Sequence, residues 1–522
     1  MEHRFATPAR SWSRSGSPAT HTMLCLCAVL ILASIAKASA ATALTKTELA
    51  VVEGLNSGDG TDLGALPDKT ISADFLGRLI AGEIPGTKMR HNGIQLKNAR
   101  IEGNFDISGE DVRVPFTCEH CVFTDNVDMS DAHFFHNVSF ERTTFDHDIN
   151  MDHAVADGDV DIRDAQFGAD VDFSALQVAG SLYVGGAHVN ADGQQASFDH
   201  VKVGILAEFS NLELKGPLTL ESAELNQLRL GRDMNLCNSC TGIRTAPSID
   251  LEQAAIHGEL TILGLKVDNL YASGLDVRGR TILQGLQITS GADLRGARFQ
   301  YLILANDVSW PNQNSTAGSR TQLDGITISQ IEVQDARNFD PAAPAYYPAT
   351  DDLYKTLLKQ WPDNAGYSAR PYQQLETAFA AAGRSDLADL AYESMKDKER
   401  TSGHLSLVQE FGSAMLSLLV RYGREPIRAL YASIGFIVLG WFIFRQRKSV
   451  DPKKPEDKDK KFNPFWYSLD LFLPLSTLPD ADIWAPKQDD RFRNIYARVH
   501  SLLGWILIPI GLAAITGLLV VK

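Results

Sequence analysis

The sequence predicts a mainly β fold, a solenoid of short parallel strands stacked in coils, followed by helices and a membrane module. Three observations predict it: apolar residues recur with a period of eleven through the middle of the chain, the spacing then becomes helical, and two long apolar runs lie near the end. Of the 522 residues, 44% are hydrophobic and 22% are charged, which excludes a disordered or collagen-like chain.

The N-terminus predicts a signal peptide over residues 1–40. Three arginines precede an uncharged run at 23–36, and the small residues Ala38 and Ala40 precede the expected cleavage site. An uncleaved anchor is the alternative, and both interpretations place the next domain outside the cytoplasm. Residues 1–40 contain four basic residues and one acidic residue, so their removal changes the net charge from −15 to −18. An acidic exported chain is not expected to bind nucleic acid.

The central repeat contains two interleaved apolar series, each with a step of eleven residues. The first series is Phe123, Phe134, Phe145, Ala156, Phe167, Val178 and Val189, and the second is Met129, Phe140, Met151, Ile162, Phe173 and Val184. Most members have a small or apolar partner two residues earlier, which is the spacing of a short strand with one buried face. Only tight corners fit between such pairs, so we expect coils of about 20–22 residues that bury a continuous core. Phe123, Phe145 and Phe167 should then stack as one internal ladder.

This pattern resembles the pentapeptide-repeat family, and the resemblance covers roughly residues 91–306. It implies a right-handed quadrilateral parallel β-helix, which we place at residues 91–335. Residues 41–90 are expected to form an N-terminal helical cap. Two interruptions of the period, at 190–196 and 231–248, are expected to be loops.

Four cysteines follow the leader, as two Cys-x-x-Cys pairs. Cys118 and Cys121 fall on inward positions on either side of one corner, where Cα atoms within about 7 Å allow a disulfide. Cys237 and Cys240 lie in the second interruption, which a local disulfide would brace. A pair of buried thiols and a redox-active dithiol are alternatives for the first pair. A shared zinc site is disfavoured, because five to six coils separate the pairs by about 25 Å.

Residues 146–172 contain nine acidic residues and a single base, Arg163. The outward residues Asp128, Asn150 and Asp172 are spaced by 22 and should form one row, and Asp161 is assigned to the same acidic face. This face indicates either a surface for a cation or basic partner, or a solvated face that prevents pairing with other sheets. The second interpretation is favoured. Some proteins of the resembled family mimic DNA and inhibit gyrase, a target that an exported chain would not meet.

The C-terminal part predicts a helical linker, hairpin and interfacial helix over 336–425 and a membrane module over 426–522. The runs 427–444 and 501–521 are apolar and long enough to span a bilayer. The segment 445–500 between them carries twelve basic residues, and the positive-inside rule places it in the cytoplasm. This orientation agrees with an exported β-helix.

The cytoplasmic segment contains an apolar stretch that is too short to span and predicts a re-entrant or interfacial helix. The residues assigned to this re-entrant segment are Tyr467, Asp470, Pro474, Ser476 and Asp480. The order of helix, short helix and helix is similar to that of two-helix potassium-type channels. A Thr-Val-Gly-Tyr-Gly filter is expected there, whereas this chain has Ser-Thr-Leu-Pro-Asp at 476–480.

The tail also resembles a bacterial family of β-helix proteins that is sometimes labelled membrane-associated oxidoreductase. The resemblance rests on Tyr422-Gly423-x-x-Pro426, on Asn463-Pro464 with Tyr467-Ser468-Leu469-Asp470, and on Leu503-Gly504-Trp505. It implies a protein of the bacterial inner membrane with its β-helix in the periplasm. The glycines at 504, 511 and 517 lie on one predicted helix and indicate close helix packing, which would suit self-association.

No nucleophile elbow, P-loop, HExxH or dinucleotide fingerprint occurs in the sequence, so it predicts no catalytic, cofactor-binding or metal-binding residue. The expected function is that of a non-enzymatic, membrane-anchored extracytoplasmic scaffold with a protein partner or self-association. The alternatives are an oligomeric channel-like or transport protein with a degenerate pore, and a thiol-disulfide oxidoreductase acting through Cys237 and Cys240.

Overall fold

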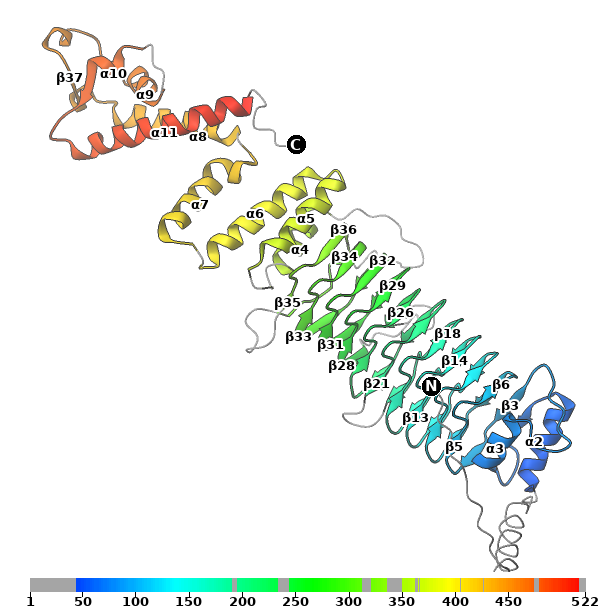
Figure 1. Ribbon diagram of the computed structural model, residues 1–522. Coiled ribbons are helices and arrows are strands. Elements are labelled where there is room, and N and C mark those ends of the chain that lie inside the picture. The colour runs from blue at the N-terminus through cyan, green and yellow to red at the C-terminus, as the bar shows by residue number, and fades with distance from the viewer. Residues whose placement is uncertain are drawn as a thin grey trace, which may run out of the picture.

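The computed structural model shows a long solenoid with helices at both ends, followed by a separate helical bundle (Figure 1). It describes residues 44–189, 195–232, 244–311, 321–335, 350–361, 365, 367–403, 405–425, 427–473 and 478–515. The predicted signal peptide at 1–40 lies outside the described residues.

Each coil in the first half of the solenoid contributes four short strands. One coil contains β11 (Val138–Ser139), β12 (Thr144–Phe145), β13 (Ile149–Asn150) and β14 (Val155–Ala156), and β15 (Val160–Asp161) begins the next coil. In each strand one apolar residue is buried and its neighbour is at least partly exposed. In β14 both residues are apolar: Ala156 is buried and Val155 is half-buried. A step of 22 residues therefore returns the chain to the same side, one coil further along.

Equivalent strands of successive coils pair in parallel, which confirms the predicted solenoid. Phe123 pairs with Phe145 and Phe145 pairs with Phe167, so the three residues lie in one ladder. Their rings are stacked, with centroids 5.2 and 5.4 Å apart. The ladders form a 7-stranded, a 10-stranded and a 19-stranded sheet, and the last contains two sides of the coil.

Non-glycine residues in the left-handed region turn the chain at recurring corners. φ is 54° at His120, 55° at Arg142 and 55° at Asp164, again at a spacing of 22 residues. An L-residue in this conformation costs about 1–2 kcal/mol. The backbone amides offset this cost through hydrogen bonds to the next coil, as from Arg142 N to the Arg163 carbonyl at 2.8 Å. Stacking, rather than local preference, therefore fixes these corners.

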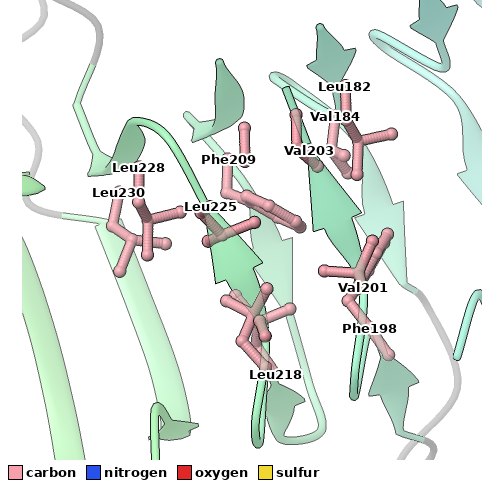
Figure 2. Packing of buried hydrophobic residues seen from close by; sticks show 14 of the residues in the cluster. Leu182, Val184, Phe198, Val201, Val203, Phe209, Leu218, Leu225, Leu228 and Leu230 are labelled. Carbon is pink, nitrogen blue, oxygen red and sulfur yellow. The ribbon is translucent and has the colours of Figure 1, made fainter. Parts of the chain in front are cut away.

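The shape of the coil changes in the second half of the solenoid. The 7-stranded sheet ends at β24 (Glu213–Leu214), and later strands are longer, such as β32 (Asp276–Gln284) and β34 (Arg298–Ala305). Figure 2 shows the leucine and valine side chains that fill the interior near this change. The prediction of a loop over 231–248 was wrong at its end, because β28 (Arg244–Asp250) pairs with β25 (Leu218–Thr219) and β31 (Leu265–Tyr271). The first interruption also ends earlier than expected, since Ala196 already belongs to β21 (Ala196–Ser197).

Helices cover both ends of the solenoid and share its core. At the N-terminal end, α2 (Lys46–Ser57) and α3 (Ala73–Ile80) bury apolar side chains in this core. The expected helical cap also contains β1 (Thr61–Asp62) and β2 (Thr70–Ser72), which pair with the first coil. At the other end, α4 (Asp351–Gln360), α5 (Ala369–Ala381) and α6 (Ser385–Thr401) lie against the last strand, β36 (Thr327–Gln334).

The bundle beyond α6 begins with α7 (Leu407–Val420) and is built on α8 (Ile427–Ile443) and α11 (Arg491–Ile515), which lie side by side (Figure 1). Between α8 and α11 the chain forms α9 (Pro464–Phe472), α10 (Asp480–Ile483) and a hairpin of β37 (Val450–Pro452) and β38 (Trp484–Pro486). Among the described residues, one helix, Arg491–Leu512, is long and apolar enough to cross a membrane, and Ile427–Ile443 is apolar but shorter. The helix that contains the second predicted span, 501–521, starts at Arg491, and residues 516–521 lie outside the described residues.

Candidate functional site

The acidic row of the solenoid follows one edge of the 10-stranded sheet. The register places Asp128, Asn150 and Asp172 beside one another on successive coils. Each side chain closes the turn that follows its strand. Asp128 Oδ1 accepts hydrogen bonds from Ser130 N at 3.0 Å and Ser130 Oγ at 2.7 Å, and Asp172 Oδ1 accepts one from Ser174 N at 3.0 Å. The row therefore has a structural role in the turns as well as an outward position.

Asp161 does not belong to this row. It lies on β15 in the 19-stranded sheet, whereas Asp128 and Asp172 belong to the 10-stranded sheet. Its carboxylate accepts a hydrogen bond from Arg163 Nε at 2.9 Å and a second from the same guanidinium. Arg163 also stacks over Tyr183, with its Cζ 5.3 Å from the ring centroid. The single base of the acidic segment thus neutralises Asp161, and the structure separates two surfaces that the sequence suggested were one.

Cys118 and Cys121 form a disulfide across one corner, with Cα atoms 5.7 Å apart. Both residues are buried, at 0% and 1% exposure. Thr143 of the next coil covers the corner, because its Oγ1 donates to the Cys118 carbonyl at 2.6 Å. Exchange requires access of an attacking thiolate to a sulfur atom, and this burial does not provide it. Cys237 and Cys240 lie outside the described residues.

A cluster of ion pairs joins α5 and α6, the helices that cover the C-terminal end of the solenoid, to the helical bundle. Arg424 lies between Glu376 of α5 and Asp389 of α6, with its Nη1 3.0 Å from Asp389 Oδ1. Its guanidinium carbon is 4.2 Å from the ring centroid of Tyr392, also on α6. These contacts cross 48, 35 and 32 positions of the chain, so no local pattern in the sequence points to them.

The backbone at this junction is strained. Arg421, Tyr422 and Gly423 have φ values of 45°, 53° and 91°, so three successive residues adopt the left-handed conformation. Arg421 pairs with Glu393 of α6, and Tyr422 donates a hydrogen bond to Asp397 at 2.8 Å. Burial raises the pKa of Glu393, and the guanidinium of Arg421 opposes this rise. Contacts to α6 hold the left-handed turn, and this turn sets the direction in which the bundle leaves the solenoid.

The bundle exposes apolar side chains to an extent that the solenoid does not. On α7, Leu407 is 85% exposed and Val408 is 82% exposed. On α8 and α11, the most exposed large apolar residues include Tyr431, Leu502 and Trp505, at 67%, 61% and 59%. Exposed apolar side chains gathered in one part of a chain are typical of surfaces that contact a membrane or another protein.

The interior of the bundle is polar where α9 enters between α8 and α11. Ser468 Oγ donates to the Ile437 carbonyl of α8 at 2.8 Å and lies 3.3 Å from His500 Nε2 of α11. Ser468 and His500 are both fully buried. Two glycines give α9 its place: a Cβ on Gly440 would collide with the Ser468 hydroxyl, and one on Gly504 would collide with the Phe472 carbonyl.

The glycines of α11 are thus used within the chain. The sequence suggested Gly504 and Gly511 as contacts for self-association. In the structure Gly504 faces α9, and Gly511 faces Leu430 of α8. Gly517 lies outside the described residues. Close packing predicted from small residues is present, but its partner is the same chain.

The structure brings together three of the five residues assigned to the re-entrant segment. Tyr467 and Asp470 are buried on α9, at 1% and 3% exposure, and Asp480 begins α10 beside Asp470. Pro474 and Ser476 lie outside the described residues. The hydrogen bond from Ala481 N to Asp470 Oδ2, at 2.5 Å, shows that the chain returns to α9 after this gap. The sequence did not identify His500 and Gly440 as contacts of α9. The one available indication was that each lies within an apolar helical segment.

The fold and these sites define a class of protein: a parallel β-solenoid that is joined through capping helices to an apolar helical bundle. A family model described as Pentapeptide repeats (9 copies) matches residues 119–166. This match and the solenoid together support a pentapeptide-repeat β-helix. No curated protein and no solved structure gives a significant match. Among the described residues, no group of three or more His, Cys, Asp or Glu side chains is arranged to hold a metal ion.

Proposed function

We propose that this protein is a membrane-anchored scaffold, with a right-handed β-helix that presents its repetitive outer surface to a protein partner in the periplasm of a bacterial cell. The observation that carries this proposal is the junction. Arg421 and Arg424 tie the bundle to the same helices that close the solenoid core. A rigid solenoid held at a fixed angle to an anchor is suited to presenting a surface, and stacked apolar side chains fill its core in the described residues.

The membrane assignment is supported by the lengths and outer surfaces of α8 and α11. The 17 residues of α8 extend about 26 Å, close to the roughly 30 Å of the hydrocarbon layer. Exposed residues such as Tyr431, Leu502 and Trp505 would face lipid. The amphipathic α7 would lie at the interface, with Leu407 and Phe411 toward the acyl chains.

The orientation is supported by charge. The chain between α8 and α11 lies at the end of the bundle remote from the solenoid (Figure 1). The segment 445–500 carries twelve basic residues, which favours the cytoplasmic side for that end. The solenoid, with its acidic surface, would then lie on the opposite side of the inner membrane.

Site-specific photo-crosslinking in cells tests the scaffold. We expect a probe at Asn150, at the centre of the acidic row, to give one discrete adduct, and a matched probe at Gln166 in the 7-stranded sheet to give none. Membranes washed with alkaline carbonate should retain the full chain. The same adducts at both positions, no adduct at either, or release by carbonate would contradict the proposal.

A second function, transport through an oligomeric pore, is favoured by one observation, the insertion of α9 between α8 and α11. The test is ion current through a planar bilayer that contains the purified full chain. A current that Asp480→Asn abolishes and Asp459→Asn leaves unchanged would support a pore. Absence of any ion current from the wild-type protein in this assay would exclude a pore.

A further inference from the structure

The end of α9 carries a carboxyl group into the packed part of the bundle. The depth of α9 is shown by the Ser468 hydrogen bond to Ile437 and by the rings of Phe472 and Phe436, whose centroids are 6.5 Å apart. Asp470 lies on the same helix between these contacts and is 3% exposed. Its side chain is therefore screened from bulk water.

One oxygen of this carboxyl group has a hydrogen-bond partner and the other does not. Asp470 Oδ2 accepts the N–H of Ala481. Asp470 Oδ1 is inaccessible to water and has no hydrogen-bond partner in the part of the chain that the structure describes. A buried carboxylate without a cation costs several kcal/mol, because its charge loses hydration without compensation. A bound proton removes the charge.

Charged groups of both signs lie around Asp470. Asp480 and Asp482 of α10 face it, and Tyr467 lies one turn earlier on α9. Among the described residues, Lys453 is the cation whose charge acts on Asp470, and its Nζ donates to the Ala481 carbonyl at 2.6 Å. From α11, His500 hydrogen-bonds to Ser468 instead.

The electrostatic trend follows this geometry. Burial raises the pKa of Asp470 and the charge of Asp482 adds to this rise, while the backbone N–H groups of Ala481 and Asp480 and the charge of Lys453 oppose it. Burial also raises the pKa of Asp480, with an added contribution from Asp470. Two carboxyl groups that interact in this way titrate as a pair, so the first proton is held more tightly than by an isolated aspartate.

We infer that Asp470 and Asp480 form a proton-binding site, and that the proton bound there at neutral pH keeps α9 docked against α8 and α11. A proton fits this site better than a metal ion, since the described residues around it do not supply three ligand side chains. When the proton leaves, the buried Asp470 carries a charge beside that of the half-exposed Asp480, and the docking of α9 weakens. The inference does not depend on the scaffold function.

Infrared spectroscopy of the full chain in lipid nanodiscs tests the site. The wild type should show a protonated-carboxyl band at neutral pH that Asp470→Asn removes. Asp480→Asn should move the midpoint of its titration to lower pH by on the order of one unit, because one like charge is lost. The exposed Asp459→Asn is the matched control and should leave band and midpoint unchanged. Absence of the band in the wild type, or a band that both Asp470→Asn and Asp480→Asn leave unchanged, would overturn the inference.

Hydrogen exchange of residues 464–472 gives a second readout that does not rely on one variant. In the wild type, protection of α9, corrected for the intrinsic rate, should fall as the pH rises through the midpoint of the band. In Asp470→Asn it should not vary with pH. Protection that follows added Mg²⁺ instead of pH would assign the site to a metal ion and overturn the proton assignment.

Discussion

Replacement of Phe145 by alanine should destabilise the first half of the solenoid more than any exposed substitution. Phe145 is fully buried, and its ring lies between those of Phe123 and Phe167, with a third neighbour, Phe140, at 5.7 Å. Removing a buried phenylalanine costs about 3–5 kcal/mol, and each aromatic pair adds about 0.5–1.5 kcal/mol to simple burial. Because three rings lose a partner, we expect about 4–5 kcal/mol.

Hydrogen exchange by mass spectrometry measures this loss coil by coil. In a solenoid each coil depends on its neighbours, so amides of β8 (Val122–Phe123), β12 and β16 (Gln166–Phe167) should exchange about a thousandfold faster. Phe135 is the control, since it is 37% exposed and its replacement should cost about 1 kcal/mol or less. Equal effects of Phe135→Ala and Phe145→Ala would refute the internal ladder as the source of stability.

Three further perturbations test the bundle, the junction and the turns. Gly504→Ala should displace α9 and increase its exchange at least tenfold, whereas Gly435→Ala, whose Cβ would meet nothing within 4 Å, should have no effect. Arg424→Gln should cost about 1–2 kcal/mol, a value reduced by its partial exposure, and should make the 402–425 segment sensitive to protease. Hydrogen bonds from the Ser108 N–H and hydroxyl lower the pKa of Asp106, so their stabilisation is present above the unfolded value and is lost as the pH falls below about 4. Thermal unfolding should show this loss in the wild type and less of it in Ser108→Ala.

The central repeat was predictable because stacking makes neighbouring coils repeat their inward residues. Phe123, Phe145 and Phe167 occupy the same inward position in three successive coils, so their spacing of 22 residues is enough to predict the ladder. The change of coil shape was not predictable, because Ile249 pairs with Leu218 across a long interruption, and the 22-residue spacing is lost there. Pro247 also weakened a strand assignment there, since proline lacks an N–H for the ladder.

The acidic face and the junction show a different limit. Alternation along each strand identifies outward residues but does not say on which side of the coil they lie, so Asp161 was grouped with Asp128 and Asp172. Arg424 lies just before the apolar run 427–444, and no neighbouring residue in the sequence indicates its partners. Only the fold brings it to Glu376 and Asp389, 48 and 35 positions away.

The two parts of the chain distribute polarity in opposite ways, and the junction is where this distribution reverses. In the solenoid phenylalanine and valine point inward and aspartate points outward. In the bundle Ser468 and His500 are buried while Trp505 is exposed. In the membrane anchoring proposed above, this reversal matches a change in the medium around the chain, and the ion pairs of Arg424 would lie in water on the solenoid side of that boundary. The charged junction would therefore fix both the depth and the angle at which the solenoid stands on the membrane.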